Sequence, residues 1–293
     1  MPELPEVETM VRGVRPSMEG RNLVELRIID RGYRPLTMLP SSTEVCRRVA
    51  GARIARVWRL GKRVVLDFAD RGTLAIEPRM TGLMLTSDPP SVEHLRLEFL
   101  LRDASSPSAA DPFSVWFWDR RGLGTITWRA AGEIDELIRQ RKLGPDALTL
   151  DAPQWQAALG ITSRAVKVAL LDQKLVAGVG NLYASEILHL AGISPLLAAS
   201  KLTQAQWERL AEAAREVLEL AILHEGSTLS DGTYRNALNK AGGYQNSHRV
   251  YAKAGEACQT CREGLIERIV QAQRSTFYCG SCQALKVKRW RKT

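Results

Sequence analysis

Residues 258–282 read CQTCREGLIERIVQAQRSTFYCGSC, in which two Cys-x-x-Cys pairs are separated by seventeen residues. Two residues between cysteines let one tight turn present both sulfurs to a metal, and two such turns complete a tetrahedral site. The spacing therefore predicts one structural zinc ion with no open position for catalysis. Two disulfides in a secreted protein are the alternative, and the lack of a secretory signal disfavours them. The predicted ligands are Cys258, Cys261, Cys279 and Cys282.

The cysteine pairs lie in the most basic part of the chain. Residues 255–293 contain eight Lys and Arg against three Asp and Glu, which supplies +5 of the total formal charge of +9. This balance favours an acidic partner. At the end of the chain, Lys286–Thr293 place five cations around Trp290, and we favour a solvated tail there over a specific nucleic-acid contact.

Length and composition exclude several classes of protein. The chain has 293 residues, of which 45% are hydrophobic, so it can form folded cores and is not a disordered protein. No stretch approaches the ~20 apolar residues of a membrane span. Glu3, Glu6 and Glu8 do not fit the basic start of a secretory signal. We therefore expect a cytoplasmic protein that does not enter membranes, with Cys46 as a small buried residue.

Residues 1–130 are predicted to form a β-sandwich preceded by one short helix. Pro5 suits an early helical position, and the apolar residues after it follow helical spacing until Pro16, where the helix is expected to end. Strands are predicted from alternating or continuously apolar runs at 24–28, 64–66, 95–99 and 115–118. Residues 103–112, rich in Ser, Ala and Pro, are predicted to be a solvated hairpin loop.

Residues 150–226 are predicted to be helical. Thr203 and Gln206 form a capping-box pattern before an apolar face that stops at Gly226. Two further helices are predicted at 163–171 and 181–191.

A glycine turn lies between those two helices. Gly178 and Gly180 allow close backbone approach, and the free N–H groups at Asn181 favour an anion such as phosphate, although chain reversal alone also explains the glycines. The Gly- and Asn-rich stretch 226–248 is either a loop that covers a substrate or a disordered connection.

Several motifs, in one order along the whole chain, resemble the Fpg/Nei family of DNA glycosylases, and within it the bacterial formamidopyrimidine-DNA glycosylases. The first is Met1-Pro2-Glu3-Leu4-Pro5-Glu6-Val7-Glu8. The others are Lys62, Met80-Thr81-Gly82, Asp119-Arg120-Arg121-Gly122-Leu123-Gly124, Leu143-Gly144-Pro145, Gly178 to Glu186, and the four-cysteine finger with Arg274.

The resemblance implies an α+β multidomain protein with three parts. These are a catalytic N-terminal β-sandwich with a short helix (1–130), a helix-two-turn-helix domain with a substrate-covering loop (150–248) and a zinc-finger β-hairpin with a basic tail (249–293). Residues 131–149 would be a linker. The partner would be damaged double-stranded DNA lying across the cleft between the halves, bound by a monomer in the bacterial cytoplasm at the nucleoid.

The resemblance also implies the chemistry, which is base excision followed by abasic-site lyase cleavage. Once Met1 is removed, Pro2 presents a secondary α-amine, and α-amino groups titrate near ~7.7–8.0. By the family mechanism this amine attacks the sugar C1′, and the resulting iminium draws electrons for β- and δ-elimination. Glu3 matches the family's general acid/base, and Glu6 supports it. Lys62 matches a lysine on DNA phosphate near the reacting sugar.

Three residues match the family positions that fill the hole left by an extruded nucleotide. They are Met80, Arg121 and Leu123. The pattern departs from the family, because Leu123 replaces the commoner Phe and no Pro precedes Arg121. Glu77-Pro78-Arg79 also stands where His-Leu-Gly is common. A weaker stacking wedge and a different loop path are therefore expected.

Four further residues match family positions in the second half of the chain. Lys167 and Asn181 are expected to grip phosphate, and Arg274 of the finger hairpin is expected to do the same as a member of the catalytic set with Pro2, Glu3 and Lys62. Glu186 is expected to support the site around Pro2.

Two alternatives compete with an oxidised-purine glycosylase. A Nei-type enzyme for oxidised pyrimidines is disfavoured by Leu4, because that branch usually has Gly there. A noncatalytic DNA-binding protein is disfavoured because Pro2, Glu3 and Lys62 are all present.

Overall fold

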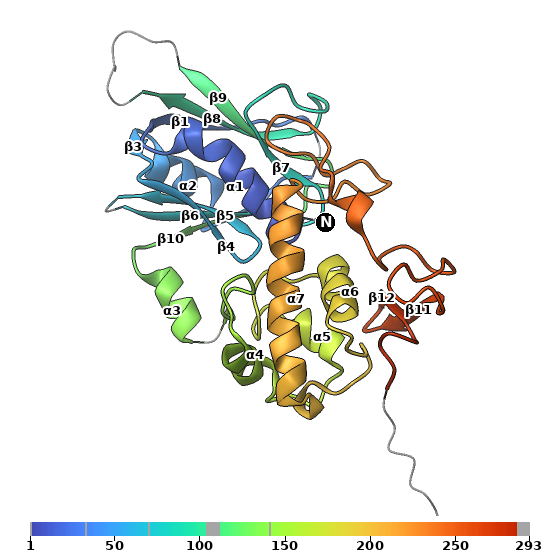
Figure 1. The fold of residues 1–293 in the computed structure, drawn as a ribbon. Coiled ribbons are helices and arrows are strands. Elements are labelled where there is room, and N and C mark those ends of the chain that lie inside the picture. The colour runs from blue at the N-terminus through green and yellow to red at the C-terminus, as the bar shows by residue number, and fades with distance from the viewer. Residues whose placement is uncertain (1, 33, 70, 104–111, 141, 286–293) are drawn as a thin grey trace, which may run out of the picture. The chain divides into compact units, whose positions relative to one another are not determined.

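The computed structural model describes every residue except 1, 33, 70, 104–111, 141 and 286–293. The chain divides into two compact units, each built from two stretches of sequence. The first unit consists of Met1–Gln140 and Leu220–Asn246, and the second of Arg141–Glu219 and Ser247–Thr293. Figure 1 shows the ribbon coloured by residue number, from blue at the N-terminus to red at the C-terminus.

Two five-stranded sheets form the first unit, which confirms the predicted β-sandwich. In spatial order the first sheet contains β3 (Ala52–Arg53), β1 (Asn22–Ile28), β8 (Leu95–Arg102), β9 (Phe113–Asp119) and β7 (Gly82–Leu85). The second contains β2 (Thr37–Leu39), β10 (Thr125–Arg129), β6 (Gly72–Glu77), β5 (Arg63–Phe68) and β4 (Arg56–Leu60). Neighbouring strands are antiparallel except for β2 and β10.

Two helices complete this sandwich. Helix α1 (Leu4–Met18) contacts β4 and β7, which are edge strands of the two sheets. Helix α2 (Ser42–Val49) contacts the edge strand β2 and also β1, which is next to an edge strand. The buried face of α1 joins residues of both sheets in one core. Its members from α1 are Val7, Met10, Val11, Val14 and Met18.

Three local predictions for this unit need correction. Helix α1 continues past Pro16 to Met18, because Met18 is buried in the core and the N–H of Glu19 still donates to the carbonyl of Arg15. A bulge at Val24 breaks the expected alternation of β1. Cys46 is only half-buried, although it packs against the core and burial raises the pKa of its thiol.

Three further predictions concern the linker, the loop at 103–112 and membrane insertion. The predicted linker contains α3 (Glu133–Arg139). Most of the loop expected at 103–112 lies outside the described residues. None of the helices in the described part of the chain is both long enough and apolar enough to cross a membrane.

The second unit contains the helices and the finger hairpin. Its helices are α4 (Ala152–Leu159), α5 (Val166–Leu170), α6 (Asn181–Leu190), η1 (Ala199–Lys201) and most of α7 (Gln204–Leu223), and its hairpin is β11 (Ile266–Gln271) with β12 (Arg274–Cys279). A short helix, η2 (Tyr244–Ser247), falls at the boundary of the units.

The helix predictions for this unit differ in accuracy. The Thr203–Gln206 capping box is present, since each backbone N–H donates to the other side chain. Helix α6 matches its prediction within one residue. Helix α5 is shorter than predicted, because Ala165 bridges to Ala198 and the N–H of Val166 donates to Leu197 instead of starting a longer helix.

Candidate functional site

The N-terminal residues of the first unit are buried and held in place. Pro2 and Glu3 are both buried, and Glu3 is the N-cap of α1. The carboxylate of Glu6 holds this segment, because its Oε2 accepts the N–H of Glu3 at 2.8 Å and its Oε1 accepts the N–H of Ser227 at 2.9 Å. Glu6 therefore joins the start of the chain to the segment after α7.

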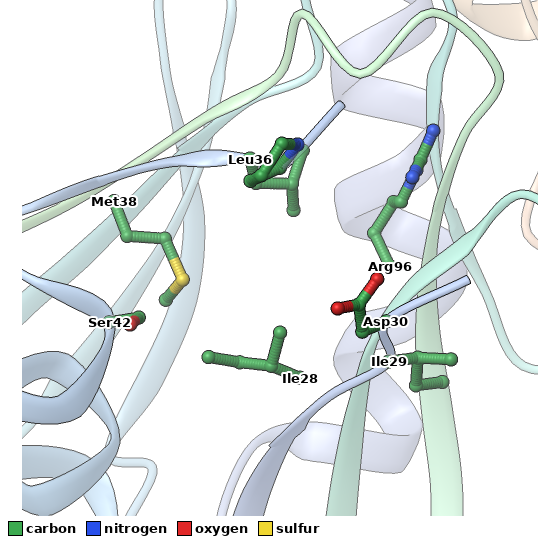
Figure 2. A pocket seen from close by; sticks show the side chains of 8 residues that line it. Ile28, Ile29, Asp30, Leu36, Met38, Ser42 and Arg96 are labelled. Carbon is green, nitrogen blue, oxygen red and sulfur yellow. The ribbon is translucent and has the colours of Figure 1, made fainter. Parts of the chain in front are cut away.

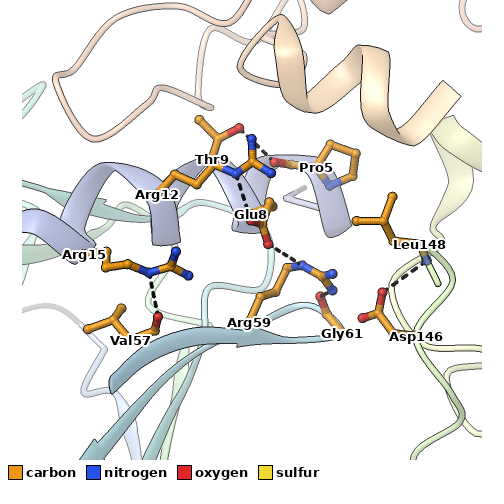
Figure 3. A network of polar contacts seen from close by, with 10 residues as sticks. All are labelled: Pro5, Glu8, Thr9, Arg12, Arg15, Val57, Arg59, Gly61, Asp146 and Leu148. Atoms are coloured by element: carbon orange, nitrogen blue, oxygen red, sulfur yellow. Dashed lines mark hydrogen bonds and ion pairs between the residues drawn. The ribbon is translucent and has the colours of Figure 1, made fainter. Parts of the chain in front are cut away.

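A second carboxylate on α1 connects to the turn that carries Lys62. Glu8 accepts one hydrogen bond from Arg12 at 2.9 Å and one from Arg59 at 3.0 Å (Figure 3). Burial acts to raise the pKa of Glu8, but the two guanidinium groups outweigh it and hold the pKa below its usual value. Arg59 also donates to the carbonyl of Gly61 at 3.0 Å, next to Lys62. Lys62 itself is half-buried between β4 and β5.

The loops that carry Met80 and Arg121 are joined by one buried aspartate. Asp119 accepts hydrogen bonds from the Thr81 hydroxyl, from the N–H of Arg121 at 3.2 Å and from the N–H of Gly124 at 2.8 Å. Thr81 also accepts from the N–H of Arg121 at 3.0 Å.

The three predicted hole-filling residues consequently lie on two adjacent, cross-linked loops, since β7 pairs with β9. Met80 and Arg121 are exposed and Leu123 is half-buried. Exposed side chains on loops tied together by hydrogen bonds could insert between DNA bases, and this role stays a prediction.

The segment 226–246 packs closely against this site. A Cβ on Gly226 would lie 2.9 Å from the Glu6 side chain, and one on Gly242 would lie 2.4 Å from the carbonyl of Gly226. Arg120 reaches the same segment, where its Nη2 donates to the Thr233 hydroxyl at 2.8 Å. The glycines thus permit close packing, and a covering role for the segment stays a prediction.

The second unit brings the expected phosphate-binding residues together. Lys167 is fully buried, and its Nζ donates to the Asn181 side chain at 2.7 Å. Asn181 in turn donates from Nδ2 to the carbonyl of Ser275 at 2.9 Å, next to Arg274 in the hairpin. Arg274 is exposed. In this structure Lys167 orients Asn181, and a direct phosphate contact by Lys167 stays a prediction.

Glu186 organises the start of the finger. It is fully buried, and its carboxylate accepts the N–H groups of Arg249, Val250 and Tyr251 at 2.8, 3.0 and 2.7 Å. Burial raises the pKa of Glu186 above its usual value, against the lowering effect of these three donors. The support that it was expected to give to Pro2 stays a prediction.

The four cysteines of the finger form one cluster. Their sulfurs all lie within 4.8 Å of one another, with Cys258 to Cys282 at 3.8 Å and Cys261 to Cys279 at 3.7 Å. Four Zn–S bonds of about 2.3 Å in a tetrahedron require sulfur separations of about 3.8 Å. Both of the separations given above match this value, so the cluster fits a zinc ion.

Backbone donors support the thiolates of this cluster. The N–H of Gly264 donates to Cys261 Sγ at 3.4 Å, and a Cβ on Gly264 would lie 2.8 Å from Cys279 Sγ. N–H donation from Gly264 and then from Glu263 lowers the pKa of Cys261 to about 6. A lowered pKa favours the thiolate that binds a metal.

A surface pocket of about 150 Å³ is lined by other residues of the first unit (Figure 2). Its lining consists of Ile28, Ile29, Asp30, Pro35, Leu36, Met38, Ser42 and Arg96. This lining contains no residue predicted for the site. Arg96 belongs to the lining and also donates to the carbonyl of Asp119 at 2.9 Å.

Comparison with known families covers nearly the whole chain. Residues 1–126 match the formamidopyrimidine-DNA glycosylase N-terminal domain, 143–233 match the formamidopyrimidine-DNA glycosylase H2TH domain, and 255–285 match the zinc finger found in FPG and IleRS. A formamidopyrimidine-DNA glycosylase of Chloroflexus aurantiacus is 37% identical over 285 residues, which cover 97% of this chain and 98% of the relative. The chain belongs to the formamidopyrimidine-DNA glycosylase family.

Solved structures of the family agree with this assignment. MutM (Fpg) of Thermus thermophilus superposes with a TM-score of 0.80 at 34% identity, covering 96% of this chain and 98% of that one. A Lactococcus lactis Fpg mutant in complex with DNA containing Fapy-dG superposes with a TM-score of 0.82 at 30% identity, covering 97% and 100%.

Membership confirms two predictions. The chain is a DNA glycosylase of base excision repair. Its zinc finger holds one structural zinc through the four clustered cysteines.

Several residues that hold the site were not predicted from the sequence. Asp119 and Thr81 belong to the motifs that carry the resemblance, but nothing in the sequence predicted the hydrogen bond between them. Arg59 and Ser227 had no local signal.

His189 is the least expected of these residues. Its Nε2 lies 3.5 Å from Cys258 Sγ, and burial, followed by the charge of Arg249, lowers its pKa to about 4.

Proposed function

We propose that the chain removes oxidised purines from duplex DNA and then cuts the strand at the resulting abasic site, with the amine of Pro2 as nucleophile. The substrate class is supported by solved relatives in complex with DNA that contains Fapy-dG or a carbocyclic 8-oxo-G, at 30% and 29% identity. The observation that carries the proposal is the burial of Pro2 and Glu3, where Glu6 holds the backbone of Glu3 beside Pro2.

In the proposed reaction the nitrogen of Pro2 forms a bond to the sugar C1′ as the bond from C1′ to the damaged base breaks. Glu3 transfers the protons that the departing base and the opening sugar require. The product is a cationic iminium, because the proline nitrogen already has two carbon substituents. Its charge acidifies the C2′ proton, whose loss breaks the C3′–O bond, and a second elimination breaks the C5′–O bond.

Extrusion of the damaged nucleotide costs a few kcal/mol of unstacking and leaves a gap in the duplex. Met80, Arg121 and Leu123 would fill this gap from the loops that Asp119 joins. The guanidinium of Arg121 would donate hydrogen bonds to the unpaired base of the opposite strand.

Asn181 and Arg274 would hold phosphates and so set the register of the protein on DNA without reading sequence. Lys62 would neutralise a phosphate beside the reacting sugar. We propose a monomer that acts on chromosomal DNA in the bacterial cytoplasm, in association with the nucleoid. The basic tail of Lys286–Thr293 lies outside the described residues, and its salt-sensitive attraction to DNA stays part of the proposal.

Borohydride trapping tests the proposal. The protein, with its N-terminal mass determined to establish removal of Met1, is mixed with a duplex containing 8-oxoguanine, and the adduct is reduced and mapped by peptide mass spectrometry. We expect one covalent adduct, attached at Pro2. A chain with an N-terminal affinity tag blocks this amine, whereas the same tag at the C-terminus leaves it free and serves as the matched control.

The outcomes separate the three functions considered. Faster trapping on a duplex with an oxidised pyrimidine would assign the Nei-type specificity. Tight duplex binding with no adduct would assign a noncatalytic DNA-binding protein. An adduct on another residue would refute Pro2 as nucleophile.

A further inference from the structure

His189 lies in the last turn of α6, and its ring faces the zinc cluster of the finger. The Nε2 atom is 3.5 Å from Cys258 Sγ, which is within hydrogen-bond range for sulfur. The side chain is buried, with 4% of the residue exposed. Within the described part of the chain, the other ring nitrogen is buried without a hydrogen-bond partner. The contact with Cys258 is therefore the polar interaction that accounts for the orientation of this ring.

The chemistry of the cluster decides which atom donates. Four thiolates around Zn²⁺ leave a net charge of −2, and a zinc-bound thiolate can only accept a hydrogen bond. A neutral imidazole carries one proton, so Nε2 must hold it to face this sulfur. Cys261 receives a comparable donation from the Gly264 N–H at 3.4 Å. The two N–H groups thus each offset part of the negative charge, one from the finger and one from the helical domain.

We propose that His189 is a positioning residue of the zinc site, whose Nε2–H donates to the Cys258 thiolate and thereby ties helix α6 to the finger. Two other residues of α6 reach the same module. Asn181 donates to the carbonyl of Ser275, and Glu186 accepts from the backbone of 249–251. Helix α6 therefore contacts the finger at its first turn, its middle and its last turn. Zinc at Cys258 and the orientation of Asn181 are linked through one rigid element.

The test uses the full-length, zinc-loaded protein and measures zinc affinity by competition with a chromogenic chelator. His189→Phe keeps an aromatic ring of similar size and removes the donor, whereas His189→Gln places an amide N–H near the position of Nε2. We expect His189→Phe to weaken zinc binding by about 10–100-fold, as loss of an outer-shell partner does. His189→Gln should stay within about threefold of the unchanged protein, because it keeps a donor. His224→Phe, at an exposed histidine near the end of α7, is the matched control and should change nothing.

A spectroscopic measurement separates this role from simple packing. Cobalt(II) replaces zinc in the four-cysteine site, and its thiolate-to-metal charge-transfer band reports the electron density on sulfur. Loss of the N–H donor should move this band to lower energy in His189→Phe, whereas His189→Gln should keep the band of the unchanged protein. Unchanged zinc affinity in His189→Phe would overturn the proposal. Equal losses in both variants would also overturn it, and so would a shifted band in His189→Gln if the Phe variant does not fold.

Discussion

Replacement of Glu6 by Gln is the most informative perturbation of the N-terminal site. The two carboxylate oxygens each accept one backbone N–H, from Glu3 at 2.8 Å and from Ser227 at 2.9 Å. An amide has only one acceptor oxygen, so Glu6→Gln can satisfy one of these donors and must turn its NH₂ towards the other. The substitution changes shape very little, which leaves the hydrogen bonds as the quantity that is tested.

The expected loss of stability follows from these contacts. A hydrogen bond to a charged group contributes about 1.5–3 kcal/mol, and a buried donor left without an acceptor costs about 1–3 kcal/mol. These two free energies are not added, because both describe the loss of the same hydrogen bond. Removal of a buried charge offsets part of the loss. We therefore expect Glu6→Gln to lower the free energy of unfolding by about 2 kcal/mol, which corresponds to about 30-fold in the folded-to-unfolded ratio.

Urea unfolding followed by circular dichroism measures this loss, and borohydride trapping measures its effect on the site. Trapping should slow by at least about tenfold, since small displacements of reacting groups reduce rates strongly. The matched control is Glu25→Gln, which breaks an ion pair with Arg27 in which both side chains are about half exposed, and which should cost less than about 1 kcal/mol. Equal stability losses in the two variants would show that Glu6 does not hold the N-terminus through its two acceptors.

Three further outcomes are expected. Cys258→Ser should lose zinc and bind DNA more weakly, while the β-sandwich stays folded. Metal analysis, duplex titration and circular dichroism measure these three outcomes, and retained zinc with unchanged DNA affinity would contradict the prediction. Arg274→Ala should reduce the salt-dependence slope of duplex binding by about 0.9, whereas exposed Lys201→Ala should leave it unchanged; equal slopes in both would remove Arg274 from the phosphate contacts. Arg120→Met and Thr233→Val both break the 2.8 Å hydrogen bond between these two residues, and Thr233→Val also removes the weaker bond from its hydroxyl to the carbonyl of Asp231 at 3.4 Å. Both variants should slow release of the damaged base by about 3–10-fold without slowing cleavage at a preformed abasic site, as measured on the two duplexes; parallel losses on both would show a general effect on folding.

Short-range patterns carried most of the predictions that were confirmed. The Cys-x-x-Cys pairs bring sulfurs together because two intervening residues form one turn. The Thr203–Gln206 box and the start of α6 depend on residues only a few positions apart, whose backbone geometry is local. The β-sandwich could be predicted in outline, because short apolar segments such as residues 64–66 indicate strands without any information from the rest of the chain.

Contacts between distant residues could not be predicted in this way. The bulge at Val24 shifts the pairing with β8 between Leu23 and Glu25, and nothing in residues 24–28 themselves shows where a partner strand forces an extra residue. Arg59 gave no signal because a lone arginine before a turn is usually solvated, and its burial against Glu8 depends on where α1 crosses β4.

The sequence by itself determined the zinc ligands and the family, because both are written in short motifs of neighbouring residues. Tertiary structure alone decided what holds them. Thr81 meets Asp119 across 38 residues, His189 meets Cys258 across 69, and Glu6 meets Ser227 across 221. Such pairs form only when sheet register and helix packing bring the two stretches together, and those depend on the whole core at once.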